Sequence, residues 1–238
     1  MTADLLDNLS FKQMRILFPE LARACERRLV GTYDEFVDLL LGDIDDGLRA
    51  LERNPELRQK DSEDRLTIEL VNFLRARSYN ATHESKHGGK VDILVEHLDR
   101  GFTWLGEAKI HSSYEYLFQG FQQLCTRYSQ GTPDSNRGGL IAYVFGKNCG
   151  AVMELWKERL PGFSEQKLEF SACSTPRAPF SFITTHLHPS SGLPYTVRHM
   201  GVVLHFTPKD KSAARRAPRK AAKKASASTP DVQKSSVT

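Results

Sequence analysis

The chain has 238 residues, 39% of them hydrophobic, and a formal net charge of +4. This is the composition of an ordinary globular protein with one well-buried core, and its four cysteines are too few and too widely spaced for a disulfide scaffold or a metal knuckle. The longest apolar stretches, residues 36–41 and 140–145, fall far short of the roughly 20 residues that span a bilayer. Because no signal segment opens the chain either, we expect a cytoplasmic protein that contacts no membrane, with reduced cysteines in its core.

Residues 4–60 are predicted to be helical. Apolar residues recur there at three- and four-residue spacing, with breaks at Pro19 and at Gly31-Thr32, which is the pattern of amphipathic helices. Nothing in this segment has catalytic spacing, and we expect its acidic side chains to lie on solvated helix faces. The chain therefore divides into a helical N-terminal region at residues 1–61, a core at 62–207 and a tail at 208–238.

A new helix is predicted to begin after Ser62, which is a suitable N-cap. Apolar residues from Leu66 to Leu74 make one face of this helix. At about 100° per residue, Glu63 falls near the middle of that face and Glu69 falls at its edge. An acid centred on a core-facing surface needs a partner inside the protein. The alternative is that Glu63 lies in solvent and interacts favourably with the positive N-terminal end of the helix dipole.

The pattern then changes to that of strands. It predicts, in chain order, strands at 79–85, 90–97 and 102–110, a helix at 114–130, a strand at 137–146, a helix at 151–160 and a strand-rich segment at 167–206. Turn residues at 87–90 and 98–101 indicate that the first three strands form antiparallel hairpins. Three antiparallel strands, a crossover helix and a further apolar strand predict an α/β fold with a mixed sheet flanked by helices.

The last segment, from Pro208 onward, contains nine Lys or Arg, two Asp and almost no large apolar side chain. The net charge of this segment is +7. Subtracting it from the +4 of the whole chain leaves a net charge of −3 on residues 1–207. Such a segment cannot bury enough surface to offset the entropy of ordering it, so we expect a disordered basic tail. The tail resembles that of a linker histone and would bind phosphate backbones without reading sequence. The alternative is a solubilising extension without a dedicated partner.

Three charged residues interrupt the apolar strands at 90–97 and 102–110. Glu107 and Lys109 point to the same side because side chains alternate along a strand, and the hairpin brings Asp92 beside them. Two carboxylates around a divalent cation are typical of oxygen-ligand metal sites, so Mg²⁺ is the expected ion and Mn²⁺ the alternative. Lys109 would orient or deprotonate a water, or steady developing negative charge.

This order of residues resembles the PD-(D/E)xK phosphodiesterase superfamily over residues 62–146: a helix with an acid, then Asp92, then Glu-Ala-Lys after fourteen residues, then a crossover helix. The resemblance implies a restriction-endonuclease-like core and a metal-dependent nuclease. In it Asp92 and Glu107 hold Mg²⁺, and Lys109 is the catalytic lysine. The helix acid of the family corresponds to Glu63, with Glu69 as the alternative. A valine stands where the family name has proline, a loss that members often show.

The resemblance implicates two further residues. The run HESKHGGKVDIL is similar to a segment of small stand-alone nucleases of this superfamily, which implies that Glu84 lies opposite Asp92 as another metal ligand. The alternative is an edge-strand acid that faces water. Gln123, with the Leu and Tyr that follow it, is similar to a glutamine signature of many members, in which the glutamine reaches the active site from the side. Gln119 and Gln122 compete with it for this role.

Other candidate sites are weaker. His186 and His188 share one face of a predicted strand, but no third metal ligand is near in sequence, so we interpret them as strand histidines beside a turn. His111 continues the strand face of Lys109 and would contact phosphate or product. No Ser or Cys has the setting of a catalytic nucleophile, and the turn before Lys90 lacks the features of a phosphate-binding loop.

The leading hypothesis is therefore a Mg²⁺-dependent DNA endonuclease, which the family associates with defence or mobile elements; an RNA-cutting member is a variant of it. The second is a non-catalytic nucleic-acid-binding module on the same scaffold, although a decayed site usually loses its lysine or one acid and here all three remain. The third is an interaction protein that works through residues 4–60. A homodimer would suit a double-strand cutter, but no interface is visible in the sequence.

Overall fold

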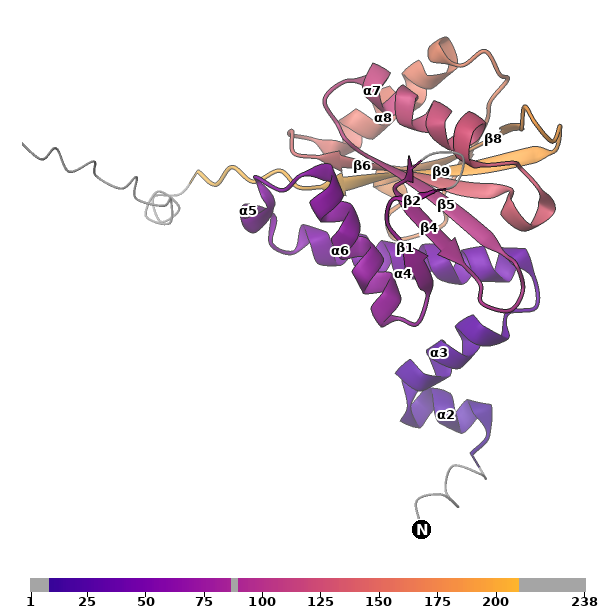
Figure 1. Ribbon diagram of the computed structural model, residues 1–238. Helices are drawn as coiled ribbons and strands as arrows, with labels where there is room; N and C mark the ends of the chain where they lie inside the picture. The colour runs from indigo at the N-terminus through magenta and orange to yellow at the C-terminus, as the bar shows by residue number, and fades with distance from the viewer. Residues whose placement is uncertain (1–8, 87–89, 210–238) are drawn as a thin grey trace, which may run out of the picture. The chain divides into compact units, whose positions relative to one another are not determined.

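The computed structural model describes residues 9–86 and 90–209 of the chain. Within them the protein is an α/β structure. Seven strands form a mixed sheet in the order β1-β4-β5-β6-β9-β8-β7, and helices cover both faces (Figure 1). The predicted class, a mixed sheet flanked by helices, is confirmed. The expectations for the tail from residue 210 onward and for the turn at residues 87–89 lie outside the described residues.

The elements follow the sequence signals closely. Ser62 caps α6 by accepting a hydrogen bond from the backbone N–H of Arg65, and Ser113 caps α7 in the same way through Tyr116. The helices are α2 (Phe11–Leu17), α3 (Pro19–Leu29), α4 (Tyr33–Glu52), α5 (Pro55–Arg58), α6 (Glu63–Ala76), α7 (Tyr114–Gln122), the π-helix η1 (Gln123–Tyr128), the short 3-10 helices η2 (Pro133–Ser135) and η3 (Ala178–Phe180), and α8 (Cys149–Phe163). The strands are β1 (Asn80–Thr82), β2 (Ser85–Lys86), β3 (Lys90–Val91), β4 (Ile93–Glu96), β5 (Thr103–Ile110), β6 (Arg137–Val144), β7 (Glu169–Ala172), β8 (Ser181–Leu187) and β9 (Pro194–Val203).

Two predicted strands are interrupted. The segment 79–85 divides into β1 and β2 at His83 and Glu84, where Glu84 adopts a φ of 52°. The segment 90–97 divides into β3 and β4 at Asp92, which lies in a bend and not within a strand as expected. β1 pairs with β4 in the main sheet, whereas β2 and β3 pair only with each other in the described part of the chain. An alternating pattern does not distinguish one strand from two aligned pieces.

The centre of the sheet is formed by β5 and β6. β5 pairs antiparallel with β4 and parallel with β6, and β6 pairs parallel with β9. Six of the eight residues of β5 and seven of the eight of β6 are buried, because helices cover both faces of these strands. The parallel connection from β5 to β6 passes through α7 and η1, which is the crossover helix that the sequence predicts.

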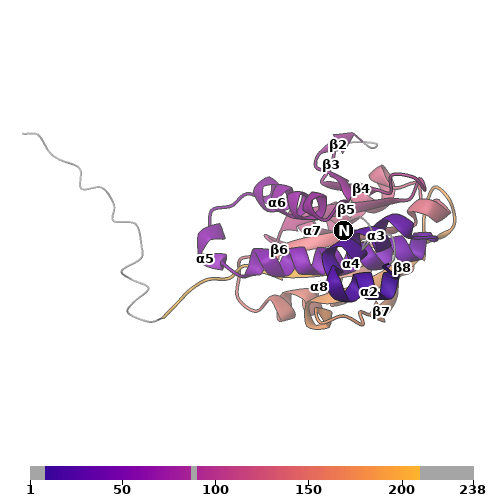
Figure 2. The same cartoon turned by 90° about the horizontal axis from the view of Figure 1, so that it is seen from below.

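Two hydrophobic clusters lie on opposite faces of the sheet. On one face α4 and α6 pack through residues such as Leu48 and Leu70, in one cluster with Trp104 of β5. Figure 2 shows these two helices crossing the near side of the sheet. On the other face α7 and α8 form a second cluster. The crossover segment buries one apolar face there, made of Leu117, Phe121, Leu124 and Tyr128.

α4 is part of the core, and its acids correct one expectation. Asp43 and Asp45 are only 6% and 3% exposed, so the prediction of solvated acids is wrong for these two residues. Asp45 accepts hydrogen bonds at 3.0 Å from Nη2 of Arg198 on β9, which lies 153 residues away in sequence. Asp43 pairs with Arg27 of α3. The N-terminal helices therefore belong to the same compact unit as the sheet, and this unit ends at Phe206.

Two expectations from composition concern the membrane and the cysteines. None of the helices among the described residues is long and apolar enough to cross a membrane. All four cysteines are free, and three of them are buried. The interpretation of the cysteines as reduced core residues therefore holds for Cys125, Cys149 and Cys173, whereas Cys25 is partly exposed.

His186 of β8 supports a prediction about acid stability. Its side chain is buried, and neither ring nitrogen has a hydrogen-bond partner among the described residues. Burial, and then His188, lowers the pKa of His186 from 6.5 to about 4. The unfolded chain therefore takes up this proton at a higher pH, so the stability that neutral His186 contributes is complete above pH 6.5 and is lost as the pH falls toward 4.

Between about pH 7.5 and pH 5 we expect the wild-type protein to lose about 2 kcal/mol more unfolding free energy than His186→Phe. Urea denaturation at the two pH values measures this difference. The comparison with the variant is needed because buried carboxylates titrate in the same range. Equal losses in the two proteins would show that His186 does not set the pH dependence.

Candidate active site

Glu107 and Lys109 lie on one face of β5, as alternation along a strand predicts. The Nζ atom of Lys109 lies 2.5 Å from Oε1 of Glu107, and the two side chains are 8% and 2% exposed. Ala108, between them, belongs to the cluster under α4 and α6 on the other face. Two neighbouring charges on a buried strand face require further polar partners nearby.

Asp92 reaches the same place from the bend between β3 and β4. Its Oδ2 atom accepts a hydrogen bond from the backbone N–H of Ala108 at 2.9 Å and lies 3.7 Å from Nζ of Lys109. The register of the hairpin explains this position, because Ile93 pairs with Gly106, and Asp92 and Glu107 are the next residues of the two segments. The hairpin thus brings Asp92 and Glu107 together although Asp92 itself is not in a strand.

Glu63, the first residue of α6, completes the group. Its Oε2 atom accepts a hydrogen bond from the backbone N–H of Ile110 at 2.6 Å, and its Oε1 atom lies 3.7 Å from Nζ of Lys109. Glu69, the alternative helix acid, forms an ion pair with Arg58 and is 42% exposed. Of the two helix acids, it is therefore Glu63 that meets Lys109. We call Glu63, Asp92, Glu107 and Lys109 the Lys109 cluster.

The Lys109 cluster has an excess of negative charge. Three carboxylates surround one ammonium group, so the net charge is −2 when all four are ionised. Burial raises the pKa of Glu63 and of Asp92. For Glu107, burial and the charge of Asp92 outweigh the ion pair with Lys109 and raise the pKa to about 7. Burial alone would lower the pKa of Lys109, but Glu107 raises it above its ordinary value, so the amine keeps its proton at neutral pH.

One oxygen of the cluster has no partner. Oε2 of Glu107 is buried and accepts no hydrogen bond from any of the described residues. An unsatisfied buried carboxylate oxygen is costly. It is relieved either by a proton, in line with the raised pKa of Glu107, or by a hard divalent cation. Asp92, Glu63 and Glu107 fit Mg²⁺ or Mn²⁺ in charge and in ligand type, and these three residues would hold the ion. Their ligand atoms do not all lie within 4.8 Å of one another, a limit that among the described residues is met by Asp64, His83 and Glu84. The three carboxylates would therefore have to draw closer together around an ion.

α7 adds two residues that the sequence did not single out. The hydroxyl of Tyr116 lies 3.4 and 3.5 Å from the two carboxylate oxygens of Glu63, and the centre of its ring lies 5.6 Å from Nζ of Lys109. Gly120 lies against the stem of Lys109, because a Cβ at this position would be 3.0 Å from Cγ of the lysine. Their four-residue spacing places both on one face of the helix. The four-residue spacing points to these two residues only when it is known that α7 crosses Lys109.

Gln123 begins η1, where the helix changes from α to π geometry. It follows Gly120 by three residues and so lies on a similar side of the helix. Its Oε1 atom is buried and has no hydrogen-bond partner in the described part of the chain, the Lys109 cluster included. π-helical turns are frequent at functional sites. Gln123 therefore lies near the side of the helix that carries Gly120, but its Oε1 atom makes no hydrogen bond with the Lys109 cluster.

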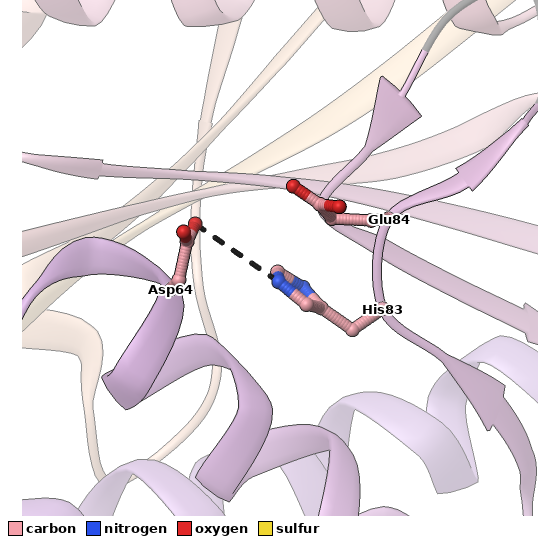
Figure 3. A group of neighbouring side chains, drawn as sticks. All are labelled: Asp64, His83 and Glu84. Atoms are coloured by element: carbon pink, nitrogen blue, oxygen red, sulfur yellow. Dashed lines mark ion pairs between the residues drawn. The ribbon is translucent and has the colours of Figure 1, made fainter.

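Glu84 is not in contact with the Lys109 cluster. Its exposed carboxylate forms an ion pair with Lys90 at 2.8 Å. It gathers instead with Asp64 and His83, and one ligand atom from each of the three lies within 4.8 Å of the others (Figure 3). Nδ1 of His83 donates to the backbone carbonyl of Asp92 at 2.9 Å, so Nε2 faces Asp64 at 3.9 Å. The exposure of Glu84 agrees with the alternative of an edge acid that faces water.

The three histidines considered as candidates from the sequence lie outside the Lys109 cluster. His111 follows β5, and its ring packs against Tyr114 with 5.1 Å between ring centres. Burial lowers the pKa of His111, and its Nε2 atom has no partner among the described residues. His186 and His188 are buried at the end of β8 and belong to no group of three metal-ligating side chains in the described ranges. Their interpretation as strand histidines agrees with this placement.

Comparison with known proteins adds nothing to this geometry. The chain matches no protein-family model, no curated protein and no solved structure. The candidate active site is therefore defined by the contacts of its own residues, and its strongest features are the three converging carboxylates and the unpartnered oxygen of Glu107.

Proposed function

We propose that the protein is a divalent-metal-dependent endonuclease that hydrolyses phosphodiester bonds in DNA. The observation that supports this most is the convergence of Glu63, Asp92 and Glu107 on Lys109, with one buried oxygen of Glu107 left unpartnered. Phosphodiester hydrolysis develops negative charge on phosphate oxygens, and a site with both cation-holding oxygens and a fixed ammonium group is suited to that charge.

In this proposal each residue of the Lys109 cluster has a distinct task. Asp92, Glu107 and Glu63 hold Mg²⁺ or Mn²⁺. When bound, the ion lowers the pKa of a coordinated water and stabilises charge on the phosphate. Lys109 is held by Glu107 at 2.5 Å and, as a protonated amine, counters negative charge on the reacting group. The hydroxyl of Tyr116 orients Glu63.

The restriction-endonuclease-like core belongs to the same proposal. Its support is the order of elements: α6 with Glu63 at its start, the β4–β5 hairpin with Asp92 and Glu107, and a parallel crossover through α7 to β6. This is the order that the resemblance over residues 62–146 implies. Because one fold serves many functions, the activity is argued from the Lys109 cluster and not from the topology.

Nicking of supercoiled plasmid tests the proposal. The wild-type protein should nick the plasmid in Mg²⁺ and should not do so in EDTA, and Lys109→Ala should lower the rate at least about a hundredfold. Glu69→Gln is the matched control, because Glu69 is an acid of the same helix that pairs with Arg58 outside the cluster. Cleavage that survives chelation or the loss of Lys109 would remove the proposed mechanism.

Gly120→Ala should slow cleavage about tenfold or more without unfolding the protein. The added Cβ would lie 3.0 Å from Cγ and 3.2 Å from Cε of Lys109, so the lysine must shift, and small displacements of catalytic groups cost much in rate. Alanine favours helix over glycine by up to about 1 kcal/mol, which supports the fold. Single-turnover cleavage and thermal melting measure the two effects.

Gly42→Ala is the control for this substitution. Gly42 lies in α4, and a Cβ there meets no atom within 4 Å. This variant should gain the same helix propensity and cleave at the wild-type rate. Equal rates for the two alanine variants would show that the position of Lys109 does not limit cleavage.

A further inference from the structure

The crossover helix carries a shallow groove lined by polar side chains. It has a volume of about 390 Å³ and lies along the end of α7 and most of η1, lined by Gln119, Gln122, Gln123, Thr126 and Arg127. Gly120, where an added Cβ would lie 3.0 Å from Lys109, follows Gln119 in the same helix. The groove and the contact with Lys109 therefore lie on the same stretch of the crossover helix.

The lining of the groove contains no carboxylate. Three other cavities in the described part of the chain each include at least one, for example Glu96, Asp43 and Glu35 respectively. This difference matters because residues 1–207 carry a net charge of −3 and a polyanion is repelled by carboxylates. Of these four cavities, the groove is the one that a polyanion can enter without meeting an acid.

The polar groups of the groove are available for a ligand. Arg127 forms no ion pair with any described residue, and its guanidinium group lies 5.8 Å from the ring of Tyr128. The side chains of Gln119 and Gln122 are exposed, and neither makes a hydrogen bond within the described ranges. Oε1 of Gln123 is buried and also lacks a partner there.

This set of groups matches the chemistry of a nucleotide. A guanidinium group binds phosphate oxygens, often with two hydrogen bonds. Glutamine amides carry both donors and an acceptor, and they pair with the edges of bases. Two exposed amides and one arginine on the helix that crosses the proposed phosphodiester-cleaving site therefore suit nucleotides that flank the cleaved bond.

We propose that this groove binds the DNA strand next to the scissile phosphate, with Arg127 on a backbone phosphate and with Gln119 and Gln122 on base edges. The inference rests on the proposed nuclease function and names where its substrate docks. Arg127 then contributes to affinity for any sequence, whereas the two glutamines set which bases are preferred beside the cut.

DNA binding tests the role of Arg127. The affinity of the full chain for short labelled duplex and single-stranded DNA is measured by fluorescence anisotropy, in metal-free buffer over a salt series. Arg127→Gln should weaken binding about five- to tenfold and reduce the slope of log affinity against log salt by about 1. Arg53→Gln is the matched control, because Arg53 is an exposed arginine at the end of α4, on the other face of the sheet. It should leave both quantities unchanged.

The cut positions test the two glutamines. The double variant Gln119→Ala, Gln122→Ala should cleave a mixed-sequence DNA in Mg²⁺ with altered base preference beside the cut. If Arg127→Gln binds as Arg53→Gln does, or if the double variant keeps the wild-type cut pattern, the groove is not the docking site, while cleavage by the wild-type protein still supports the proposed function. If the wild-type protein neither binds nor cuts DNA, the proposed function fails and this inference fails with it.

Discussion

Glu107→Gln is expected to abolish Mg²⁺-dependent DNA cleavage, with a loss of at least about a thousandfold in rate. The substitution keeps the size of the side chain and removes the charge from the most buried carboxylate of the Lys109 cluster, which is 2% exposed. It also removes the unpartnered oxygen that fits a cation. Isothermal titration calorimetry should show that binding of Mn²⁺ to the variant is weaker by a similar order.

The same substitution should stabilise the metal-free protein. Three carboxylates, of which Glu107 is buried and Glu63 and Asp92 are partly exposed, share one ammonium group. The loss of the buried charge therefore relieves their mutual repulsion by roughly 1–3 kcal/mol at alkaline pH. Thermal melting in EDTA should therefore give a higher melting temperature for Glu107→Gln than for the wild type, and added Mg²⁺ should raise the melting temperature of the wild type only. A variant that melts lower in EDTA would show that Glu107 serves stability and not an ion.

Asp45→Ala is expected to lower the free energy of unfolding by about 3–5 kcal/mol, a large part of the stability of a typical domain. The carboxylate of Asp45 lies 3.0 Å from Nη2 of Arg198 and 3.8 Å from Nε of Arg177. Both arginine side chains are only 4% exposed. The substitution leaves Arg198 buried without an acidic partner among the described residues, whereas Arg177 keeps its ion pair with Glu52. Urea denaturation at neutral pH measures the loss.

Asp38→Ala is the matched control for Asp45→Ala. Asp38 belongs to the same helix and also pairs with an arginine, Arg137, but its side chain is 69% exposed. Exposed ion pairs contribute less than about 1 kcal/mol, so this variant should unfold almost as the wild type does. Similar losses in the two alanine variants would mean that burial does not determine the strength of these pairs.

The parts of the site that the sequence predicts are those set by local periodicity. Glu107 and Lys109 share a face because alternation is a property of any strand. Glu63 faces inward because a helix with a clear apolar side leaves little freedom for its first turn. Asp92 reaches the same point because a short hairpin fixes the register. Each of these arguments needs only neighbouring residues.

The parts that the sequence did not predict depend on contacts between distant segments. Tyr116 and Gly120 acquire a role only when α7 crosses β5. Asp45 was expected in solvent, since its partner Arg198 lies 153 residues away and no local pattern connects them. The bend at Asp92 was missed because the apolar pattern continues through it.

The position of α4 beneath the sheet determines how the chain can be shortened. Removal of residues 1–61 at the boundary suggested by composition would uncover the apolar residues of one sheet face and strip Arg177 and Arg198 of Glu52 and Asp45. Lost cleavage after such a truncation would report misfolding and not the absence of a recruiting segment. A partner-binding role of the first helices is better examined with surface substitutions in the intact chain, at the exposed side chains of α2 and α3.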